Sequence, residues 1–387
     1  MINEWLVRTF VARPKEIASS RVRESYGVLE GWVSIAVNLA VFAVKLVPGL
    51  LIGSISLVAD AFHSLGDVAS SVVVIWGFKV AAKPSDKEHP FGHGRVEGIA
   101  TLVIGIMLFV VAWEFAQNSV LRLLHPKPVT ASLGLLVVLA ATVVLKEWLS
   151  RFAHRLAGTI GSSALEGDAL HHRSDVFATA VVIASLIAAR FGLHWVDGVG
   201  GLAVAGFIGA VAYKLTMGSV HPLLGAAPSP QLLKEIRETA LSVPEVDEVH
   251  DVIVHTYGGL LVTSLHAEIS AELDVVRAHE VAETVEAALN ERFGGWTVVH
   301  IDPVNRHHPL FEEVQAFLRQ TVPEIPGVEG FHDLRIVGTE EPCYVIFDLK
   351  AEEGAGPAAA VRLRGAVAGR FPQVAKVVVN VAPGYVY

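Results

Sequence analysis

The chain has 387 residues, of which 52% are hydrophobic and only 18% are charged. Its mean hydropathy of +0.50 is too high for an ordinary soluble protein. The formal net charge of −9 gives no sign of nucleic-acid binding, and the single cysteine, Cys343, excludes both an intrachain disulfide framework and a thiolate metal cluster. Any metal chemistry must therefore use the 17 histidines together with aspartate or glutamate.

The first 28 residues contain four arginines and one lysine, Lys15, together with Trp5, Phe10 and Pro14. No apolar segment followed by a small-residue cleavage site occurs there, so the segment does not read as a signal peptide. We expect it to be a basic segment on the cytoplasmic surface of a membrane.

Hydropathy predicts six membrane spans in the next part of the chain. They are Leu29–Leu51, Ile55–Val80, Gly98–Ser119, Ala131–Leu149, Ala164–Ala189 and Trp195–Leu215. Lysine and arginine are concentrated before the first span, after the second and after the fourth. We assign Lys146, Arg151 and Arg155 to the link after the fourth span. The positive-inside rule then predicts that both termini are cytoplasmic.

The second and fifth spans each carry a histidine and an aspartate four residues apart: His63 with Asp67, and His171 with Asp175. Residues at this spacing share one face of a helix. Two such helices facing each other bring two imidazoles and two carboxylates together, which suits a tetrahedral divalent ion such as zinc. An aspartate at the centre of a membrane helix costs roughly 2.5–3.5 kcal/mol, so its presence in two spans predicts an intramembrane ion site.

Asp60 and Asp168 each precede the histidine of a pair by three residues and share its helix face. We interpret them as second-shell groups or proton acceptors rather than as primary ligands. The alternative for all these polar residues is that they only satisfy one another between packed helices.

A second constellation lies on the link between spans two and three, where Asp86, His89 and His93 occur within eight residues. The D-x-x-H-x-x-x-H spacing places three oxygen or nitrogen ligands within a compact turn, which favours a second metal site. The alternative is a solvated polar loop shaped by its FGHG turn.

From Ser229 the periodicity changes to that of a soluble α+β domain. The predicted order is α-β-β-α-β, and the same order repeats with an offset of about eighty residues. The predicted fold is thus a six-span helical membrane bundle followed by a cytoplasmic ferredoxin-like αββαβ module that is duplicated. The predicted domains are residues 1–28, 29–220, 221–305 and 306–387.

The first module carries a histidine cluster. His250 and His266 fall on neighbouring strands, His300 and Asp302 share a face of the third strand, and His279 lies on the adjoining helix. We interpret these five residues as a cytoplasmic metal site. The second module keeps His332 but has Asn380 and Asp348 at matching positions, so we expect it to be structural, packing on the first module's sheet or extending a dimer contact.

The motifs ADAFHSLGD, HHRSD and DKEHPFGHGRVE, in this order within six spans, resemble those of the cation diffusion facilitator family of metal/proton antiporters. The resemblance covers Leu29–Asp302. It implies a transport site at His63, Asp67, His171 and Asp175, a second ion at the link, and a cytoplasmic cluster that helps to hold a homodimer together.

The resemblance also implies a function. It is export of a divalent ion from the cytoplasm in exchange for protons, by an integral protein of a bacterial inner membrane with no enzymatic activity. Two imidazoles and two carboxylates favour zinc as substrate and structural ion, while manganese, iron, cobalt, cadmium and nickel stay open. A membrane-embedded metallohydrolase would need a general base such as the glutamate of H-E-x-x-H, which does not occur. A metal-sensing protein with impaired transport is the remaining alternative.

Overall fold

The structure is a computed structural model that describes residues 2–17, 19–51, 55–125, 133–193, 195–338, 342–352 and 354–381. Within these ranges the side chains of Asp60 and His63 lie outside the described part. The chain forms two compact units, one made mainly of residues 1–226 and the other mainly of residues 227–387.

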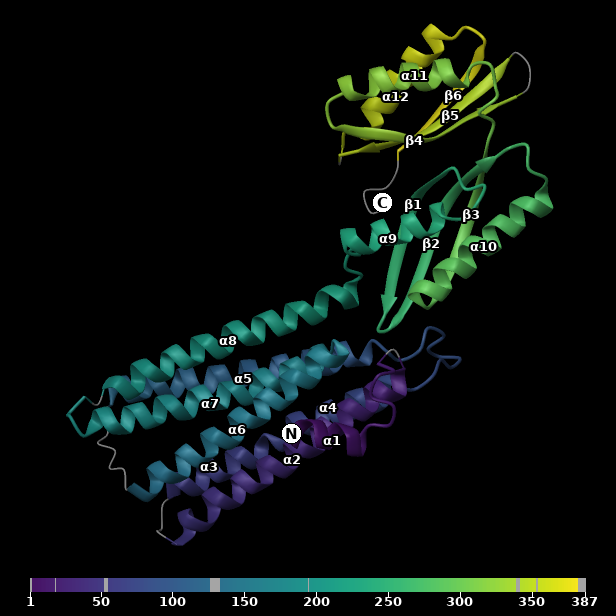
Figure 1. The fold of residues 1–387 in the computed structure, drawn as a ribbon. Coiled ribbons are helices and arrows are strands. Elements are labelled where there is room, and N and C mark those ends of the chain that lie inside the picture. Colours follow the sequence, from purple (N-terminus) through teal and green to yellow (C-terminus); the bar gives the residue numbers. More distant parts are fainter. Residues whose placement is uncertain are drawn as a thin grey trace. The chain divides into compact units, whose positions relative to one another are not determined.

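The first unit is helical (Figure 1). Its helices are α1 Ile2–Phe10, α2 Ser20–Leu51, α3 Ile55–Gly66, α4 Val68–Ala81, α5 Val96–Leu124, α6 Leu133–Ile160, α7 Ser163–Ala189 and α8 Trp195–Leu224. Among the described residues, five helical segments are long and apolar enough to cross a membrane: Ser20–Pro48, Ser64–Ala81, Val96–Leu124, Ser163–Ala189 and Trp195–Leu224. The predicted fourth span corresponds to α6, which carries Lys146, Glu147 and Arg151 within six residues and is not among these five.

The predicted second span is interrupted at a residue of the predicted transport site. Helix α3 ends at Gly66 and α4 begins at Val68, so that Asp67 lies between them. Asp67 keeps right-handed helical dihedral angles, with φ −64° and ψ −19°. The helical path therefore continues through Asp67.

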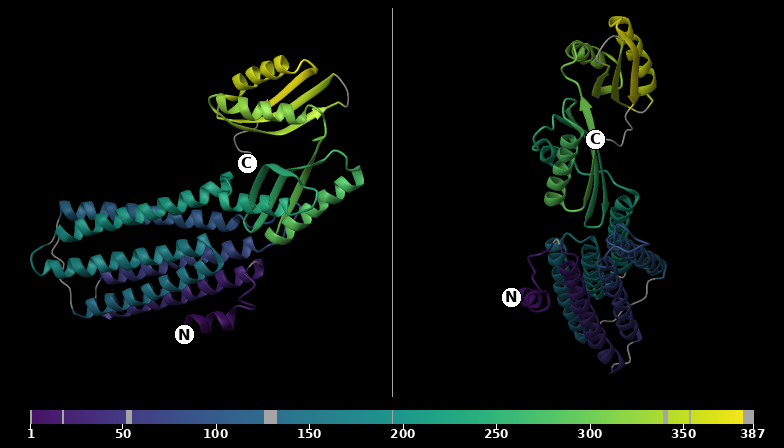
Figure 2. Two further views of the ribbon diagram at one scale, coloured as in Figure 1. Left: turned by 45° about the horizontal axis from the view of Figure 1, so that its top comes forward. Right: turned by 90° about the vertical axis from the view of Figure 1, so that its right-hand side faces the viewer.

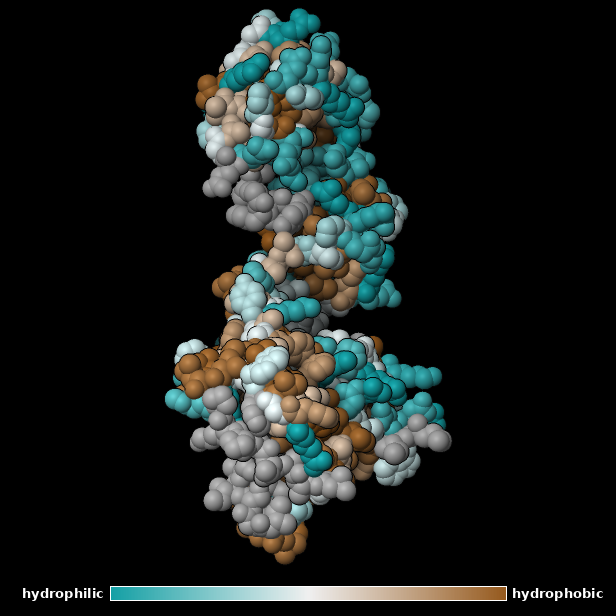
Figure 3. All heavy atoms as spheres, turned by 90° about the vertical axis from the view of Figure 1, so that its left-hand side faces the viewer, coloured by the Kyte–Doolittle hydropathy of each residue, from teal (hydrophilic) through white to brown (hydrophobic). Residues whose placement is uncertain are grey.

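The outer surface of the helices is apolar. Trp113, Val137 and Val144 are among the large hydrophobic side chains exposed there, and hydrophobic surface on this unit is visible in Figure 3. Small residues allow close approach between the helices, as is usual in membrane bundles. At Gly198 of α8, for example, an added Cβ atom would lie 2.4 Å from Leu123 Cγ and 3.0 Å from the carbonyl oxygen of Ser119, both on α5.

The second unit contains two modules built alike (Figure 1). The first comprises α9 Pro230–Leu241, β1 Glu248–Tyr257, β2 Leu260–Ser270, α10 Val275–Phe293 and β3 Trp296–Val304. The second comprises α11 Phe311–Thr321, the short 3₁₀ helix η1 Val322–Glu324, β4 Val328–Val337, β5 Cys343–Ala351, α12 Gly356–Arg370 and β6 Val374–Val381. The sheets have strand orders β1-β2-β3 and β4-β5-β6. Strands β2 and β3 pair in parallel, as do β5 and β6, whereas β4 and β5 pair antiparallel.

Each sheet carries its helices on one face (Figure 2). In the first module the core joins Leu265 and Ala267 of β2 to Ile236 of α9 and to Val285 of α10. Since side chains alternate along a strand, His266 lies on the opposite face, away from these helices. The face without helices is therefore the face that carries the predicted metal ligands.

The first strand of each module contains a local irregularity at a His-Asp pair. Asp251 has φ +51° and Asp333 has φ +52°, in the left-handed region where aspartate is tolerated better than most residues. In β4 the pairing with β5 shifts register between His332 and Arg335, as expected for a bulge. Because Val249 and Val252 are both in the core, His250 and Asp251 both fall on the open face.

The tight contact at Gly198 gives a test of the packing of α8 on α5. Gly198→Ala should destabilise the helical unit, because its methyl group overlaps Leu123 and the backbone of α5, at a cost of about 1–3 kcal/mol. Gly206→Ala, also in α8, should be harmless, because no atom lies within 4 Å of its added Cβ. Thermal unfolding in detergent measures the difference, and equal midpoints for the two variants would contradict this packing.

Candidate metal sites

The intramembrane pairs come together around a lysine. Lys146 of α6 donates hydrogen bonds from Nζ to Asp67 Oδ2 at 2.7 Å and to Asp175 Oδ2 at 2.8 Å. His171 Nε2 lies 3.6 Å from Asp67 Oδ1. Lys146, Asp67 and His171 are buried, and the Asp175 side chain is 15% exposed. Three of the four predicted transport residues thus meet, while the side chain of the fourth, His63, lies outside the described residues.

Lys146 was missed as a site residue because it was counted with the basic link after span four. The sequence does place Lys146 inside the predicted apolar span, three residues before its end. An ionisable residue inside a membrane span indicates a functional site by default. In the structure it neutralises part of the charge of two buried carboxylates, which a low-polarity interior requires. A divalent ion held between the same two carboxylates would have to displace this ammonium group.

Asp168 belongs to a second polar cluster that adjoins the transport pair through His172, since ligand atoms of His171, His172 and Asp175 lie within 4.8 Å of one another. Its Oδ2 lies 3.1 Å from His172 Nε2, and Ser34 of α2 lies 2.9 Å from the same nitrogen. Glu30, also of α2, is fully buried beside them, and its carboxylate oxygens make no hydrogen bond among the described residues. The predicted role of Asp168 in proton linkage therefore concerns this cluster, and the side chain of Asp60 lies outside the described residues.

The link residues converge as a compact turn. Asp86 accepts hydrogen bonds from the backbone N–H groups of Glu88 at 3.0 Å and His89 at 2.7 Å. Its oxygens lie 3.4 Å from His89 Nδ1 and 3.5 Å from His93 Nε2. His93 directs Nδ1 to the carbonyl of Pro84 at 3.2 Å, which leaves Nε2 facing Asp86. In metal-binding histidines, one ring nitrogen typically makes a hydrogen bond that orients the ring, so that the other nitrogen faces the metal.

The hydrogen bond from the backbone of His89, opposed by a smaller effect of burial, lowers the pKa of Asp86. The residue is therefore a carboxylate at neutral pH. Asp86, His89 and His93 can then supply three ligand atoms to one ion.

The cytoplasmic cluster is centred on Asp302. Its Oδ2 accepts a hydrogen bond from His266 Nδ1 at 2.8 Å and lies 3.4 Å from His250 Nε2. Its Oδ1 lies 3.4 Å from both His300 Nε2 and Arg335, which belongs to β4 of the second module. Asp302 and His250 are buried, whereas the His300 side chain is 63% exposed.

His279, which the sequence predicts as a member of this cluster, does not join it in the described interactions. Its side chain on α10 is 72% exposed, and its ion pair among the described residues is with Glu283, 3.3 Å away on the same helix. Asp251, which the sequence analysis did not select, takes a place in the cluster: its ligand atoms lie within 4.8 Å of those of His250 and His266. The repeated His-Asp dipeptide at 250–251 and 332–333 was the available signal.

The electrostatics of the cluster follow from burial and from these contacts. The hydrogen bond to Asp302 raises the pKa of His266. Burial alone would raise the pKa of Asp302, but His250 and His266 hold it far below its usual range. Burial, assisted by the charge of Glu248, raises the pKa of Glu268 from 4.5 to about 6.

Comparison with known proteins identifies two domains in the chain. Residues 31–224 match the cation efflux transmembrane domain, and residues 228–304 match the cytoplasmic domain of cation efflux proteins. An uncharacterised transporter of Methanocaldococcus jannaschii is 32% identical over 278 residues, covering 70% of this chain and 97% of that protein.

Two further relatives carry more specific names. The cation-efflux pump FieF of Shewanella oneidensis is 29% identical over 273 residues, covering 70% of this chain and 92% of the relative. The manganese efflux system protein MneS of Bacillus subtilis is 28% identical over 278 residues, covering 71% of this chain and 94% of the relative.

These matches define an integral membrane transporter of divalent cations, not an enzyme. The chain belongs to the cation efflux family, also called the cation diffusion facilitators. The match to the cytoplasmic domain suggests dimerisation, and it ends at residue 304, before the second module.

The pKa shifts predict how the stability of the metal-free second unit depends on pH. The raised pKa of Glu268 contributes stability below its unfolded value of 4.5, and this contribution is lost as pH rises through about 6. The raised pKa of His266 contributes below its ordinary value of 6.5 and is lost as pH rises through its folded value. The lowered pKa of Asp302 contributes stability that is fully present at pH values above 3.8, the ordinary pKa of an aspartate. In chelator, stability should therefore fall by on the order of 1 kcal/mol from about pH 5 to about pH 8.

Hydrogen exchange of β2 and β3, corrected for the intrinsic effect of pH, measures this trend in the full chain. Glu268→Gln should flatten the lower part of the curve, because the amide does not titrate. Zinc should reverse the slope, since metal binding requires deprotonated ligands. A metal-free protein that gained stability over this range would contradict the assignment.

Proposed function

We propose that this transporter exports zinc from the cytoplasm in exchange for protons, through a site formed by His63, Asp67, His171 and Asp175. The observation that carries the proposal is that Asp67 and Asp175 share the ammonium group of Lys146 inside the helical unit, with His171 beside Asp67. Buried carboxylates that share a counter-cation form a site for positive charge, and a divalent ion matches their combined charge.

The spacing of the groups supports direct coordination. Two ligands of a tetrahedral zinc ion, each about 2.0–2.1 Å from the metal, lie about 3.3 Å apart. His171 Nε2 and Asp67 Oδ1 are 3.6 Å apart, close to that separation. Imidazole and carboxylate must be deprotonated to bind the ion, so binding expels protons and protonation expels the ion. A site that faces alternate sides of the membrane then couples export to proton entry.

The identity of the ion rests on the donor set. Two imidazole nitrogens with two carboxylate oxygens suit zinc, and borderline sites also accept manganese, iron, cobalt, cadmium or nickel according to availability. The relatives are named for cation efflux and, in one case, for manganese. The second candidate function, a metal-sensing protein with impaired transport, predicts binding at the same site without flux.

The proposal extends to the topology and the remaining sites. Six spans, with α6 as the fourth, leave both termini in the cytoplasm, in a bacterial inner membrane. Residues 1–28 then form a cytoplasmic segment, 29–220 the membrane domain, 221–305 the metal-binding module and 306–387 its second copy. The link cluster at Asp86 and the cytoplasmic cluster at Asp302 bind regulatory or structural ions, and the protein acts as a homodimer.

Flux in proteoliposomes tests the transport site. With an acidic lumen and an enclosed zinc dye, the wild type should accumulate zinc, and Asp67→Ala should abolish accumulation because it removes a ligand. The control is Asp197→Ala, which alters an aspartate of α8 that pairs with Arg122 at 3.5 Å. No flux in the wild type, or equal flux in Asp67→Ala, would refute the proposal. Zinc binding without wild-type flux would favour the sensor.

Lys146 should set the affinity of the transport site. Lys146→Met keeps the side-chain length and removes the competing positive charge from Asp67 and Asp175. We expect the apparent KM for zinc to fall about tenfold, which corresponds to ~1.4 kcal/mol, and the maximal rate to fall because the ion leaves more slowly. Initial rates at varied zinc concentration measure both quantities. A raised KM would show instead that Lys146 assists binding.

A further inference from the structure

We propose that the second C-terminal module completes a metal site with the first, so that one chain holds a divalent ion between its two modules. The ligands are His250 and Asp251 from β1 and His332 from β4. This inference rests on the proposed cytoplasmic metal cluster and adds an ion position to it. It also revises the expectation from the sequence that the second module is only structural.

The contact between His332 and Asp251 carries the proposal. His332 Nε2 lies 3.0 Å from Asp251 Oδ1, and the two side chains come from different modules. The ring of His332 lies 5.0 Å, centroid to centroid, from the ring of His250. The His332–Asp251 separation is thus near the ~3.3 Å expected between ligands of one tetrahedral ion, and the imidazole of His250 lies beside this pair.

His250 supplies a second, independent observation. Its side chain is only 5% exposed, and neither ring nitrogen makes a hydrogen bond among the described residues. Its ion-pair partners among the described residues are Asp302 at 3.4 Å and Glu268 at 3.8 Å. A buried imidazole without hydrogen bonds is unfavourable, and coordination of an ion would satisfy it. The ligand atoms of His250, Asp251 and His266 already lie within 4.8 Å of one another, so His266 is available as a fourth ligand.

The repeated left-handed aspartate explains how the two modules build this arrangement. In each copy a His-Asp dipeptide has its aspartate in the left-handed conformation, so both side chains leave the core on the open face. The two open faces carry His250 with Asp251 and His332 with Asp333. His332 of the second module is therefore the equivalent of His250 in the first module, and both contribute to the shared site.

Arg335 explains why Asp251 is the carboxylate available to the ion. Its guanidinium lies 2.6 Å from Asp333 and 3.4 Å from Asp302, and so offsets the charge of both. Asp251 lies outside this ion-pair group, and its partner is His332. Burial would raise the pKa of Asp251, but His332 lowers it, which keeps the carboxylate ionised at neutral pH.

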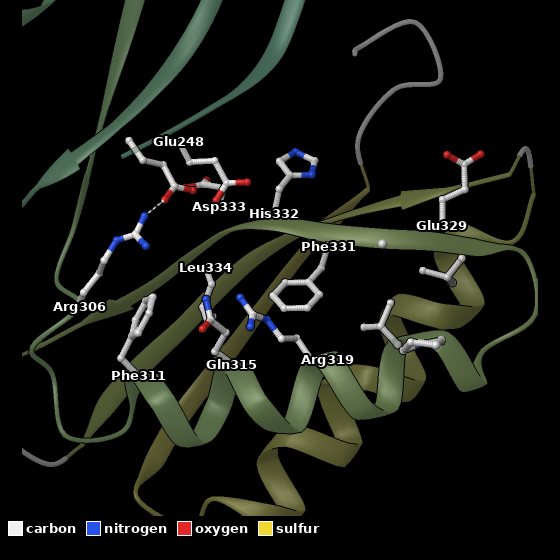
Figure 4. Close-up of a pocket in the computed structure, with 15 residues that line it drawn as sticks. Glu248, Arg306, Phe311, Gln315, Arg319, Glu329, Phe331, His332, Asp333 and Leu334 are labelled. Atoms are coloured by element: carbon white, nitrogen blue, oxygen red, sulfur yellow. Dashed lines mark hydrogen bonds and ion pairs between the residues drawn. The ribbon is translucent and has the colours of Figure 1, made fainter. Parts of the chain in front are cut away.

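A cavity lies beside His332. It has a volume of about 510 Å³, and its charged lining consists of Glu248, Glu268, Glu329 and Asp333 with Arg306 and Arg319 (Figure 4). In Figure 4, His332 and Asp333 extend from β4 to the side of Glu248, whereas Phe331 points toward α11. Of the three proposed ligands, His332 lines this cavity, so the cavity reaches the proposed site at that residue.

Zinc counting on the full-length protein in detergent tests the inter-module site. His332→Ala should lose one tightly bound zinc per chain, or bind it at least about tenfold more weakly. Asp251→Asn should have the same effect, and it is the safer variant because asparagine also tolerates the left-handed conformation. His307→Ala, at a 79% exposed side chain between the modules, is the matched control and should retain all zinc.

Hydrogen exchange with and without zinc provides the second readout. In the wild type, zinc should slow exchange in β1 and β4 together. In His332→Ala and Asp251→Asn, zinc should still protect β2 and β3 but not β4. Unchanged zinc content and unchanged protection of β4 in both variants would overturn the inter-module site.

His300→Ala separates this inference from the proposal on which it rests. If His300→Ala loses zinc while the two inter-module variants retain it, the cytoplasmic cluster stands and the inter-module site is wrong. If the wild type itself binds no zinc that depends on His300, the cytoplasmic cluster is wrong as well. Loss in all three variants, with the control intact, supports an ion held by both modules.

Discussion

The structure of the helical unit depends on the neutralisation of two carboxylates in an apolar bundle. Asp67, between α3 and α4, and Asp175 of α7 would each be strongly unfavourable without a positive partner. Lys146 of α6 contacts both, so three separate parts of the chain are held at one point. Apolar packing and small residues bring the helices close together, but they do not determine how far each helix is shifted along its axis or rotated about it. The charge contact fixes which faces of α6 and α7 point inward.

The same constraint acts in the second polar cluster of the bundle. Glu30 and Asp168 are fully buried near each other, with His172, Ser34 and hydrogen-bonding neighbours around them. Two carboxylates this close do not both ionise readily, so a proton shared among the group is the natural means of neutralisation. The bundle thus holds one pair of carboxylates around an ammonium group and a second pair beside the imidazole of His172. Two such environments suit the proposed exchange of a cation for protons.

The sequence predicted the histidine-aspartate pairs because helical periodicity alone places residues four apart on one face. Asp67, His171 and Asp175 do meet, as that argument requires. Lys146 could not be assigned in the same way, because hydropathy does not distinguish a lysine in a site from one at the end of a span. The choice depends on which helix faces which, and that is a property of the tertiary packing.

In the cytoplasmic modules, the alternation of side chains along a strand also predicts only part of the site. Alternation correctly places His266 and Asp302 on the face opposite the helices, but it assigns consecutive residues to opposite faces. The left-handed conformation of Asp251 breaks this rule and places His250 and Asp251 on the same side. The proposed contribution of His332 could not be predicted for a further reason. A module with too few ligands for a metal site of its own can still supply a ligand to the neighbouring module, and the sequence pattern of one module does not reveal this.

The candidate transport site and the cytoplasmic cluster share one design feature, which bears on how their ions leave. Lys146 lies at the carboxylates of the first, and Arg335 at the carboxylate of the second. A tethered cation lowers the affinity of a site for a free one, because the two compete for the same negative charge. Once the free ion has gone, the tethered cation takes over its electrostatic role, so the emptied site need not collapse or collect protons at every carboxylate. A transporter must release what it binds, and a built-in competitor makes release possible without weakening the selectivity that imidazole and carboxylate ligands provide.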